Sequence, residues 1–164
     1  MQRKNKLALV SHCVLNQNSV VSPLARAGGA FHSLITVLSE WSLGIYQLPC
    51  PELIHAGMKR KPQTYEDYNT PEYDAVCREA AQRVLRDLDG FRAVGCTVSL
   101  LLGIRGSPTC SLTGVTGHLF RTLMPELQHR YPDIVMLDIP EDYIEGDCHQ
   151  FHTMLRNVLR SGNY

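Results

Sequence analysis

Short apolar runs alternate with helical patterns along this chain, and that alternation constrains its fold more than any other feature. The apolar runs cover residues 7–15 (LALVSHCVL), 45–48, part of 91–104, and 134–139. They are apolar throughout rather than alternating in polarity, as strands buried on both faces are. Such strands belong to a mainly parallel sheet with helices on both sides. The sequence therefore predicts a single α/β domain over residues 1–164, three-layered and Rossmann-like or flavodoxin-like.

Four segments between and after these runs have the 3.6-residue spacing of helices. They cover 30–41, 70–89, 117–129 and 149–159. The second should begin with Thr70 as N-cap and Pro71 in the first turn, and end at Gly90. It is expected to bury four apolar side chains, Val76, Ala80, Val84 and Leu88. The polar connection 55–69 is predicted to be irregular, and either a functional loop or a solvated one.

Charge and composition narrow the possible partners. Of the 164 residues, 16 are Lys or Arg and 16 are Asp or Glu, so the formal net charge is zero. A nucleic-acid partner is therefore unlikely on charge grounds, and so is attraction to anionic lipids. The chain has neither a secretory signal pattern nor an apolar run long enough to span a membrane. We therefore expect a cytoplasmic protein that is not in a membrane.

Six cysteines are the main chemical feature of the sequence. A disulfide framework is disfavoured in a reducing compartment, and no CxxC pair is present. Three of the six, Cys13, Cys50 and Cys110, follow or end successive predicted strands. The carboxyl ends of parallel strands meet at one edge of a sheet, where ligands bind. The three thiols could therefore form one site, or they could be unrelated buried thiols.

The remaining cysteines are assigned to packing or to the surface. Cys77 falls in a predicted helix, Cys96 in an apolar strand region, and Cys148 just before the last helix. Cys148 stands near His149 and His152, a spacing that could imitate a zinc site. We favour an ordinary thiol there.

Three segments of the chain resemble a bacterial and archaeal protein family that includes the thiouracil desulfidases. They are Leu9-Val-Ser-His-Cys-Val-Leu15, Cys50-Pro-Glu52 and Ser107-Pro-Thr-Cys110. The family patterns read roughly V-S-x-C-L-L-G, C-P-E and S-P-S-C-G, and their order and spacing fit nearly the whole chain. The chain departs from the family at Val14-Leu15-Asn16, where L-L-G is usual, and at Ser111, where glycine is usual. It therefore resembles a divergent member, and the substrate does not carry over.

The resemblance implies a cofactor and a reaction. The cofactor would be a [4Fe–4S] cluster held by Cys13, Cys50 and Cys110, with the fourth iron open to a thiocarbonyl sulfur. The reaction would be hydrolytic desulfidation of a thiolated small molecule such as a thionucleobase, which converts C=S to C=O and releases sulfide. In this interpretation Glu52 is the general acid/base, and Ser107 positions substrate or water.

Each of these site residues also has a structural interpretation. Glu52 could be a first-turn carboxylate of a short helix that begins at Pro51, and Ser107 a turn hydroxyl. Asn16 and Asn18 could bond a polar heterocycle, or could belong to a turn. Arg105 could hold a substrate anion or form a salt bridge.

Two other functions remain open from the sequence. One is a non-enzymatic iron–sulfur or metal-binding module, a sulfide carrier or redox sensor, that uses the same three cysteines. The other is an α/β protein that binds a small molecule and has buried thiols but no metal. A carrier needs the cysteines but not the carboxylate of Glu52, so this residue separates the first alternative from an enzyme.

Overall fold

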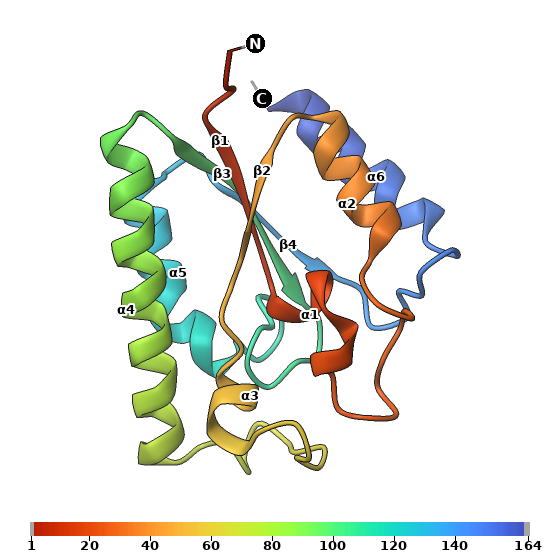
Figure 1. Cartoon of the computed structure of the whole chain (residues 1–164), viewed down its shortest axis with the longest axis vertical. Helices are drawn as coiled ribbons and strands as arrows, with labels where there is room; N and C mark the ends of the chain where they lie inside the picture. The colour runs from red at the N-terminus through yellow and green to blue at the C-terminus, as the bar shows by residue number, and fades with distance from the viewer. Residues whose placement is uncertain (1, 163–164) are drawn as a thin grey trace.

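A computed structural model describes residues 2–162 and has one four-stranded sheet, which is entirely parallel. The strands are β1 (Lys6–Val10), β2 (Gly44–Gln47), β3 (Thr97–Ile104) and β4 (Val135–Ile139). Their order across the sheet is β2-β1-β3-β4 (Figure 1). In register, Ala8 of β1 lies between Ile45 and Leu100. The predicted α/β fold with a parallel, Rossmann-like or flavodoxin-like sheet is confirmed.

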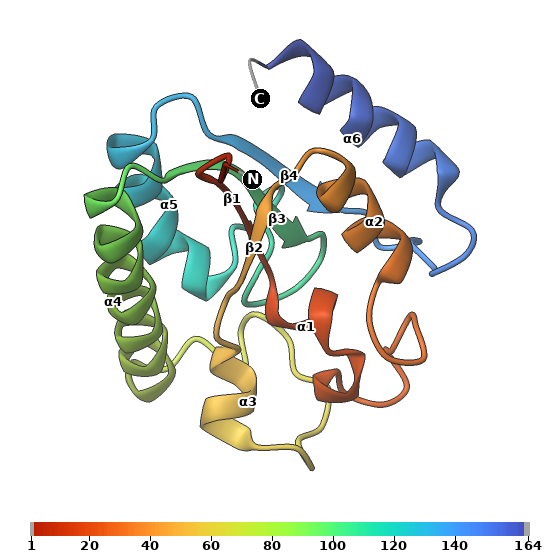
Figure 2. The same cartoon turned by 45° about the horizontal axis from the view of Figure 1, so that its top comes forward.

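Four long helices cover the two faces of the sheet. Helices α4 (Pro71–Ala93) and α5 (His118–Arg130) lie on one face, and α2 (His32–Glu40) and α6 (His149–Ser161) lie on the other (Figures 1 and 2). The four predicted helical segments are therefore confirmed, with small differences at their ends. None of the helices between residues 2 and 162 has the length and apolar character needed to cross a membrane.

The strand side chains alternate between two separate hydrophobic cores. Leu7 and Leu9 pack with α4 and α5, whereas Ala8 and Val10 pack with α2 and α6. Both sets are almost completely buried. Because β1 is apolar on both faces, its sequence is a continuous apolar run and not an alternating one.

The first strand is shorter than its apolar run predicts. Strand β1 ends at Val10, and residues His12–Leu15 form the short helix α1, followed by a 3-10 turn at Gln17–Ser19. The N–H and the hydroxyl of Ser11 both donate to the carbonyl of Leu102, at 3.1 and 3.2 Å. The carbonyl of Ser11 accepts from the N–H of Val14 at 3.0 Å, so Ser11 is the N-cap of α1 and the point where the chain leaves the sheet. Cys13 therefore lies on a helical turn beyond the sheet, not late in the strand.

Two expectations for the long helix were wrong. Thr70 caps α4 as predicted, with its side chain accepting from the N–H of Tyr73, but the helix continues past Gly90 to Ala93. A glycine inside a helix costs only about 1 kcal/mol, so packing of the surrounding turns outweighs it. The buried face also includes Cys77, while Val76 is only partly buried.

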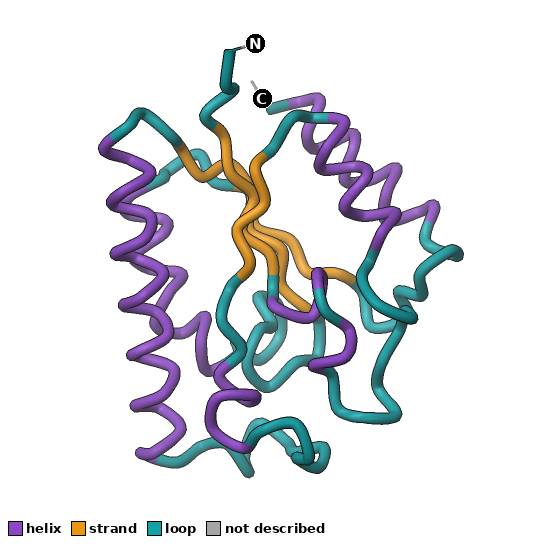
Figure 3. The backbone as a smooth tube through the Cα atoms, viewed as in Figure 1, coloured by secondary structure: helices purple, strands orange, loops and turns teal. Residues whose placement is uncertain are grey.

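Short elements and loops gather at the carboxyl ends of the strands (Figure 3). They are α1, helix α3 (Pro51–Ala56), and the segments that follow α3 and β3. The predicted irregular connection 55–69 begins two residues later than expected, because His55 and Ala56 still belong to α3. This edge of the sheet is where the candidate site lies.

Candidate functional site

The three cysteines that follow the strands line one cavity. Cys13 lies on α1 after β1, Cys50 is the N-cap of α3 after β2, and Cys110 lies in the loop after β3. The cavity has a volume of about 370 Å³ and opens at the carboxyl edge of the sheet. The sheet topology therefore brings together thiols that are 37 and 60 residues apart in the sequence.

Burial and mutual repulsion keep these thiols protonated in the metal-free chain. Burial, and after it the neighbouring Cys50, raises the pKa of Cys13 to about 12. The pKa of Cys110 is raised by burial first and then by Cys50 and Cys13. The pKa of Cys50 is also raised, mainly by burial. Such thiols become thiolates when a positive centre binds and displaces their protons.

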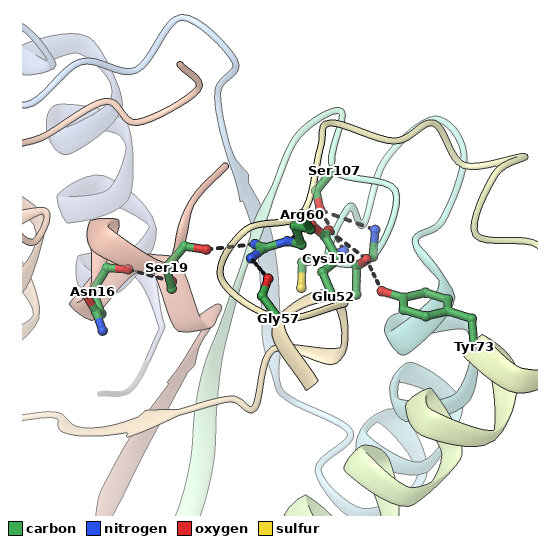
Figure 4. A network of polar contacts seen from close by, with 9 residues as sticks. Asn16, Ser19, Glu52, Gly57, Arg60, Tyr73, Ser107 and Cys110 are labelled. Atoms are coloured by element: carbon green, nitrogen blue, oxygen red, sulfur yellow. Dashed lines mark hydrogen bonds and ion pairs between the residues drawn. The ribbon is translucent and has the colours of Figure 1, made fainter. Parts of the chain in front are cut away.

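Glu52 is held in the same cavity by two different partners. It lies in the first turn of α3, two residues after Cys50. Its Oε1 accepts a hydrogen bond of 2.8 Å from the hydroxyl of Thr109, and its Oε2 lies 3.5 Å from Nε of Arg60 (Figure 4). The hydroxyl of Tyr73 lies 2.6 Å from that of Thr109 and continues the chain of bonds into the core. The helix-first-turn interpretation of Glu52 and its place in the cavity are thus both correct.

Arg60 connects Glu52 to the segment after α1, which forms one wall of the cavity. Its guanidinium donates to the carbonyls of Gly57 and Ser19, at 3.1 and 2.7 Å, and its side chain is only 4% exposed. The Nε of Arg60 is buried and has no hydrogen-bond partner, although the carboxylate of Glu52 lies nearby. Arg60 therefore links Glu52 to the segments that carry Gly57 and Ser19.

Ser107 shapes the turn that carries Cys110. The hydroxyl oxygen of Ser107 accepts hydrogen bonds from the N–H groups of Thr109 and Cys110, at 3.2 and 3.0 Å. Ser107 also lines the cavity. The predicted turn role of Ser107 is therefore present.

Two residues outside the cavity fix the loop after β3. Asp138 of β4 accepts hydrogen bonds from the N–H groups of Leu112 and Thr113 and from the hydroxyl of Thr113. Gly117 lies against the backbone of the same loop, and a Cβ there would come within 2.6 Å of the nitrogen of Cys110. The loop is therefore held tightly at the position of Cys110.

The other wall of the cavity is built around Gln17 and Arg26. The side-chain amide of Gln17 donates to the carbonyl of Cys13 and accepts from the N–H of Arg26, both at 2.8 Å. Arg26 in turn donates to the carbonyls of Pro140 and Glu141. The segment after α1 is thereby tied to the segment after β4.

The remaining predicted contact residues have different positions. Arg105 is exposed at the rim of the cavity and lines it. Asn16 and Asn18 do not line it; the backbone and side-chain amides of Asn18 donate to Oδ1 of Asn16 in a turn. Gln17, between them, is the residue that faces the cavity.

The other cysteines lie away from this cavity. Cys77 is buried in the core, as expected, and Cys96 is partly buried beside Asn5. Cys148 lies next to His152, with its Sγ 3.6 Å from Nδ1 of the ring. Throughout residues 2–162, His, Cys, Asp and Glu side chains form no group of three or more arranged to hold a metal ion.

Comparison with known proteins places the chain beside an archaeal protein. It is 34% identical over 155 residues to the uncharacterized protein MJ0003 of Methanocaldococcus jannaschii, and the match covers 94% of this chain and 97% of that protein. The chain belongs to the MJ0003 family. No model of a known protein family matches the chain, and no solved structure matches it.

Several residues of this MJ0003-family site were not singled out by their sequence pattern. Arg60 lies in the polar connection 55–69, which the sequence predicts to be either a functional or a solvated loop. Nothing in the local sequence distinguishes Arg60 from Lys59 and Lys61. Thr109 lies inside the Ser-Pro-Thr-Cys segment and could have been noticed there. Tyr73 resembles an ordinary helix core residue, and only the tertiary structure places its hydroxyl on Thr109.

Proposed function

We propose that this protein is an iron–sulfur-dependent desulfidase that acts on a thiolated small molecule. The observation that carries the proposal is the convergence of Cys13, Cys50, Cys110 and Glu52 on one cavity. The proposed reaction is R₂C=S + H₂O → R₂C=O + H₂S. It consumes one water and needs no electron donor or acceptor.

The donor set suits a polynuclear cluster. Three thiols line the cavity, and thiolates are the preferred ligands of iron–sulfur clusters. Each cysteine of a cluster binds a different iron, so the three sulfurs need not converge on one ion. When bound, a [4Fe–4S] group held by three cysteines supplies an iron without a protein ligand, which is a Lewis acid toward the sulfur of a C=S bond.

Glu52 would move the protons of this reaction. As a carboxylate it can accept a proton from the water that attacks the thiocarbonyl carbon, and later donate it to the departing sulfide. Its hydrogen bond from Thr109 and its contact with Arg60 hold the group in one orientation, so little reorientation is needed during the reaction. Ser107, which also lines the cavity, has a hydroxyl that can orient the water or the substrate.

The test is iron and acid-labile sulfide per chain after anaerobic reconstitution. The parent should hold about four of each, as one [4Fe–4S] cluster requires. Cys13→Ala, Cys50→Ala and Cys110→Ala should each lose most of both. Cys96→Ser is the matched control, because Cys96 is partly buried but lies away from the cavity, and it should keep the parent content.

The results also separate the competing functions. A parent that binds no iron overturns the proposal and leaves an α/β protein with buried thiols. A parent that binds a cluster but releases no sulfide from thiouracil or a panel of thionucleobases contradicts the desulfidase and favours a carrier or sensor. Sulfide release that requires all three cysteines supports the enzyme.

A further inference from the structure

A second thiol lies beside a base, outside the cavity of the three cysteines. Cys148 is the N-cap residue of α6, and its Sγ lies 3.6 Å from Nδ1 of His152, one helical turn further on. Cys148 is partly exposed, whereas His152 is only 6% exposed. A nucleophile that solvent can reach thus contacts a base that is fixed in the core.

A chain of hydrogen bonds decides where the imidazole proton lies. The N–H of Ser33 donates to Oε1 of Glu145 at 2.7 Å, and the hydroxyl of Tyr143 donates to Oε2 of the same carboxylate at 3.3 Å. Because Tyr143 has one hydroxyl proton, it accepts from Nε2–H of His152, 3.1 Å away. Nδ1 then carries the lone pair, and it faces the thiol of Cys148.

The surroundings of His152 keep its imidazole neutral. Burial lowers the pKa of His152, and Arg156 and His149 lower it further, whereas Glu145 and Glu40 raise it. At neutral pH the ring is therefore able to accept a proton from the thiol. The same arrangement of a cysteine, a histidine and a third group that orients the histidine activates nucleophilic thiols in general.

An open cavity of about 580 Å³ adjoins this pair and indicates what it would accept. Asp142, Asp147 and Cys148 line it, and no Lys or Arg is among its described lining residues. Two carboxylates beside the thiol favour a reagent with positive charge and disfavour an anionic one. Thiol–disulfide exchange requires only two groups from the protein, an accessible thiol and a proton acceptor.

We propose that Cys148 is a thiol–disulfide exchange site that forms mixed disulfides with small, positively charged disulfides. His152 Nδ1 takes the thiol proton, and the Cys148 sulfur attacks one sulfur of the disulfide. A new S–S bond forms, the original S–S bond breaks, and the departing thiolate takes the proton from His152. The Cys148 thiol is oxidised, and half of the small disulfide is reduced to a thiol. This site is independent of the proposed desulfidase.

The test measures the rate of mixed-disulfide formation at each cysteine by peptide mass mapping. The probes are cystamine, which is a dication, bis(2-hydroxyethyl) disulfide, which is neutral, and dithiodiglycolate, which is a dianion. Each rate is divided by the rate of the same probe with 2-mercaptoethanol. At pH 7 Cys148 should react with cystamine at least tenfold faster than Cys96, the internal reference. The normalised rate should fall in the order dication, neutral, dianion.

Variants separate the chemistry from the packing. His152→Gln should lower the Cys148 rate about tenfold at pH 7, and the difference should shrink at pH 9.5, where hydroxide in solution can replace the imidazole as the base. Tyr143→Phe keeps the aromatic ring and removes only the hydroxyl, so it should lower the Cys148 rate several-fold. This variant replaces His152→Gln as the test where His152→Gln does not fold. Asp142→Asn with Asp147→Asn should remove the preference for cystamine.

Three results overturn the proposal. One is a Cys148 rate no greater than that of Cys96. Another is an unchanged rate in His152→Gln or, where that variant does not fold, in Tyr143→Phe. The third is equal normalised rates for the three probes, which contradicts the assignment of the ligand class.

Discussion

The hydroxyl of Thr109 donates a hydrogen bond of 2.8 Å to Oε1 of Glu52, and so ties the loop after β3 to the first turn of α3. The hydroxyl of Tyr73 donates in turn to Thr109 at 2.6 Å. Since Thr109 precedes Cys110 and Glu52 follows Cys50 by two residues, this bond also sets the relative positions of two of the cysteine segments.

Removing the Thr109 hydroxyl should destabilise the chain. Thr109→Val keeps the shape of the side chain but removes the hydrogen-bond partner of Glu52 Oε1 and of the Tyr73 hydroxyl, at a cost of about 1–3 kcal/mol in the free energy of unfolding. Urea denaturation measures this loss. Thr109→Ser restores the hydroxyl and should recover most of it. A loss below about 0.5 kcal/mol in Thr109→Val would show that the bond contributes little.

Changing Glu52 should separate catalysis from cluster binding. Glu52→Gln preserves size and hydrogen-bonding capacity but cannot accept the water proton. Sulfide release from a thionucleobase should fall by about 100-fold or more, while iron content stays at the parent level. Turnover that survives at the parent rate would remove Glu52 from the mechanism. Glu66→Gln, on an exposed residue of the same region, is the control.

The contact between Arg60 and Glu52 should show strong energetic coupling. Arg60→Met leaves a mostly buried carboxylate without its cation and should lower the free energy of unfolding by about 3 kcal/mol. The double variant Arg60→Met/Glu52→Gln should lose less than the sum of the two single changes, by about 1 kcal/mol or more. Denaturation of all four proteins gives the coupling, and additive losses would mean that the two side chains do not interact.

Gly117 should tolerate no side chain. In Gly117→Ala the new methyl would meet the backbone of Thr109 and Cys110, with the Cys110 nitrogen at 2.6 Å. Because backbone cannot move aside as a flexible side chain can, we expect a loss of about 1–3 kcal/mol in the free energy of unfolding. At Gly114 φ is +72° but no atom lies within 4 Å of the Cβ position, so Gly114→Ala introduces backbone strain without a steric clash. Its loss in the free energy of unfolding should be smaller than that of Gly117→Ala. Equal losses would contradict the assignment to close packing.

The metal-free chain should lose stability above pH 9. Burial raises the pKa of Cys13 from 9.0 to about 12, so the unfolded chain releases this proton at lower pH than the folded one. The protonated Cys13 thiol makes its full contribution to the free energy of unfolding below pH 9. This contribution is lost as the pH rises to 12, at about 1 kcal/mol per pH unit. Urea denaturation at pH 8 and pH 10 gives the free energy of unfolding at each pH. The decrease between the two pH values should be smaller in Cys13→Ala than in the parent. Tyrosines that titrate in the same range contribute equally to both proteins, so an identical change would contradict the buried thiol.

The strand and helix segments could be predicted from local patterns because hydrophobic periodicity is a local property. The runs near residues 45–48 and 134–139 became strands, and Thr70 with Pro71 marked the start of α4 correctly. The errors arose where tertiary packing competes with a local signal. The chain turns into α1 at Ser11, whose carbonyl accepts from the N–H of Val14, so β1 ends early, and packing carries α4 through Gly90.

The sequence by itself determined the α/β class and pointed to Cys13, Cys50 and Cys110, because strand ends are readable from one segment at a time and parallel strand ends share an edge. Glu52 and Ser107 were singled out only by the resemblance of their segments to a known family. Only the tertiary structure decided which side chains complete the site. Arg60 and Thr109 reach Glu52 from separate segments, Tyr73 reaches Thr109 from a third, and Tyr143 bonds both Glu145 and the ring of His152. Such contacts depend on long-range packing and on the direction of each side chain, which the one-dimensional spacing of residues does not specify.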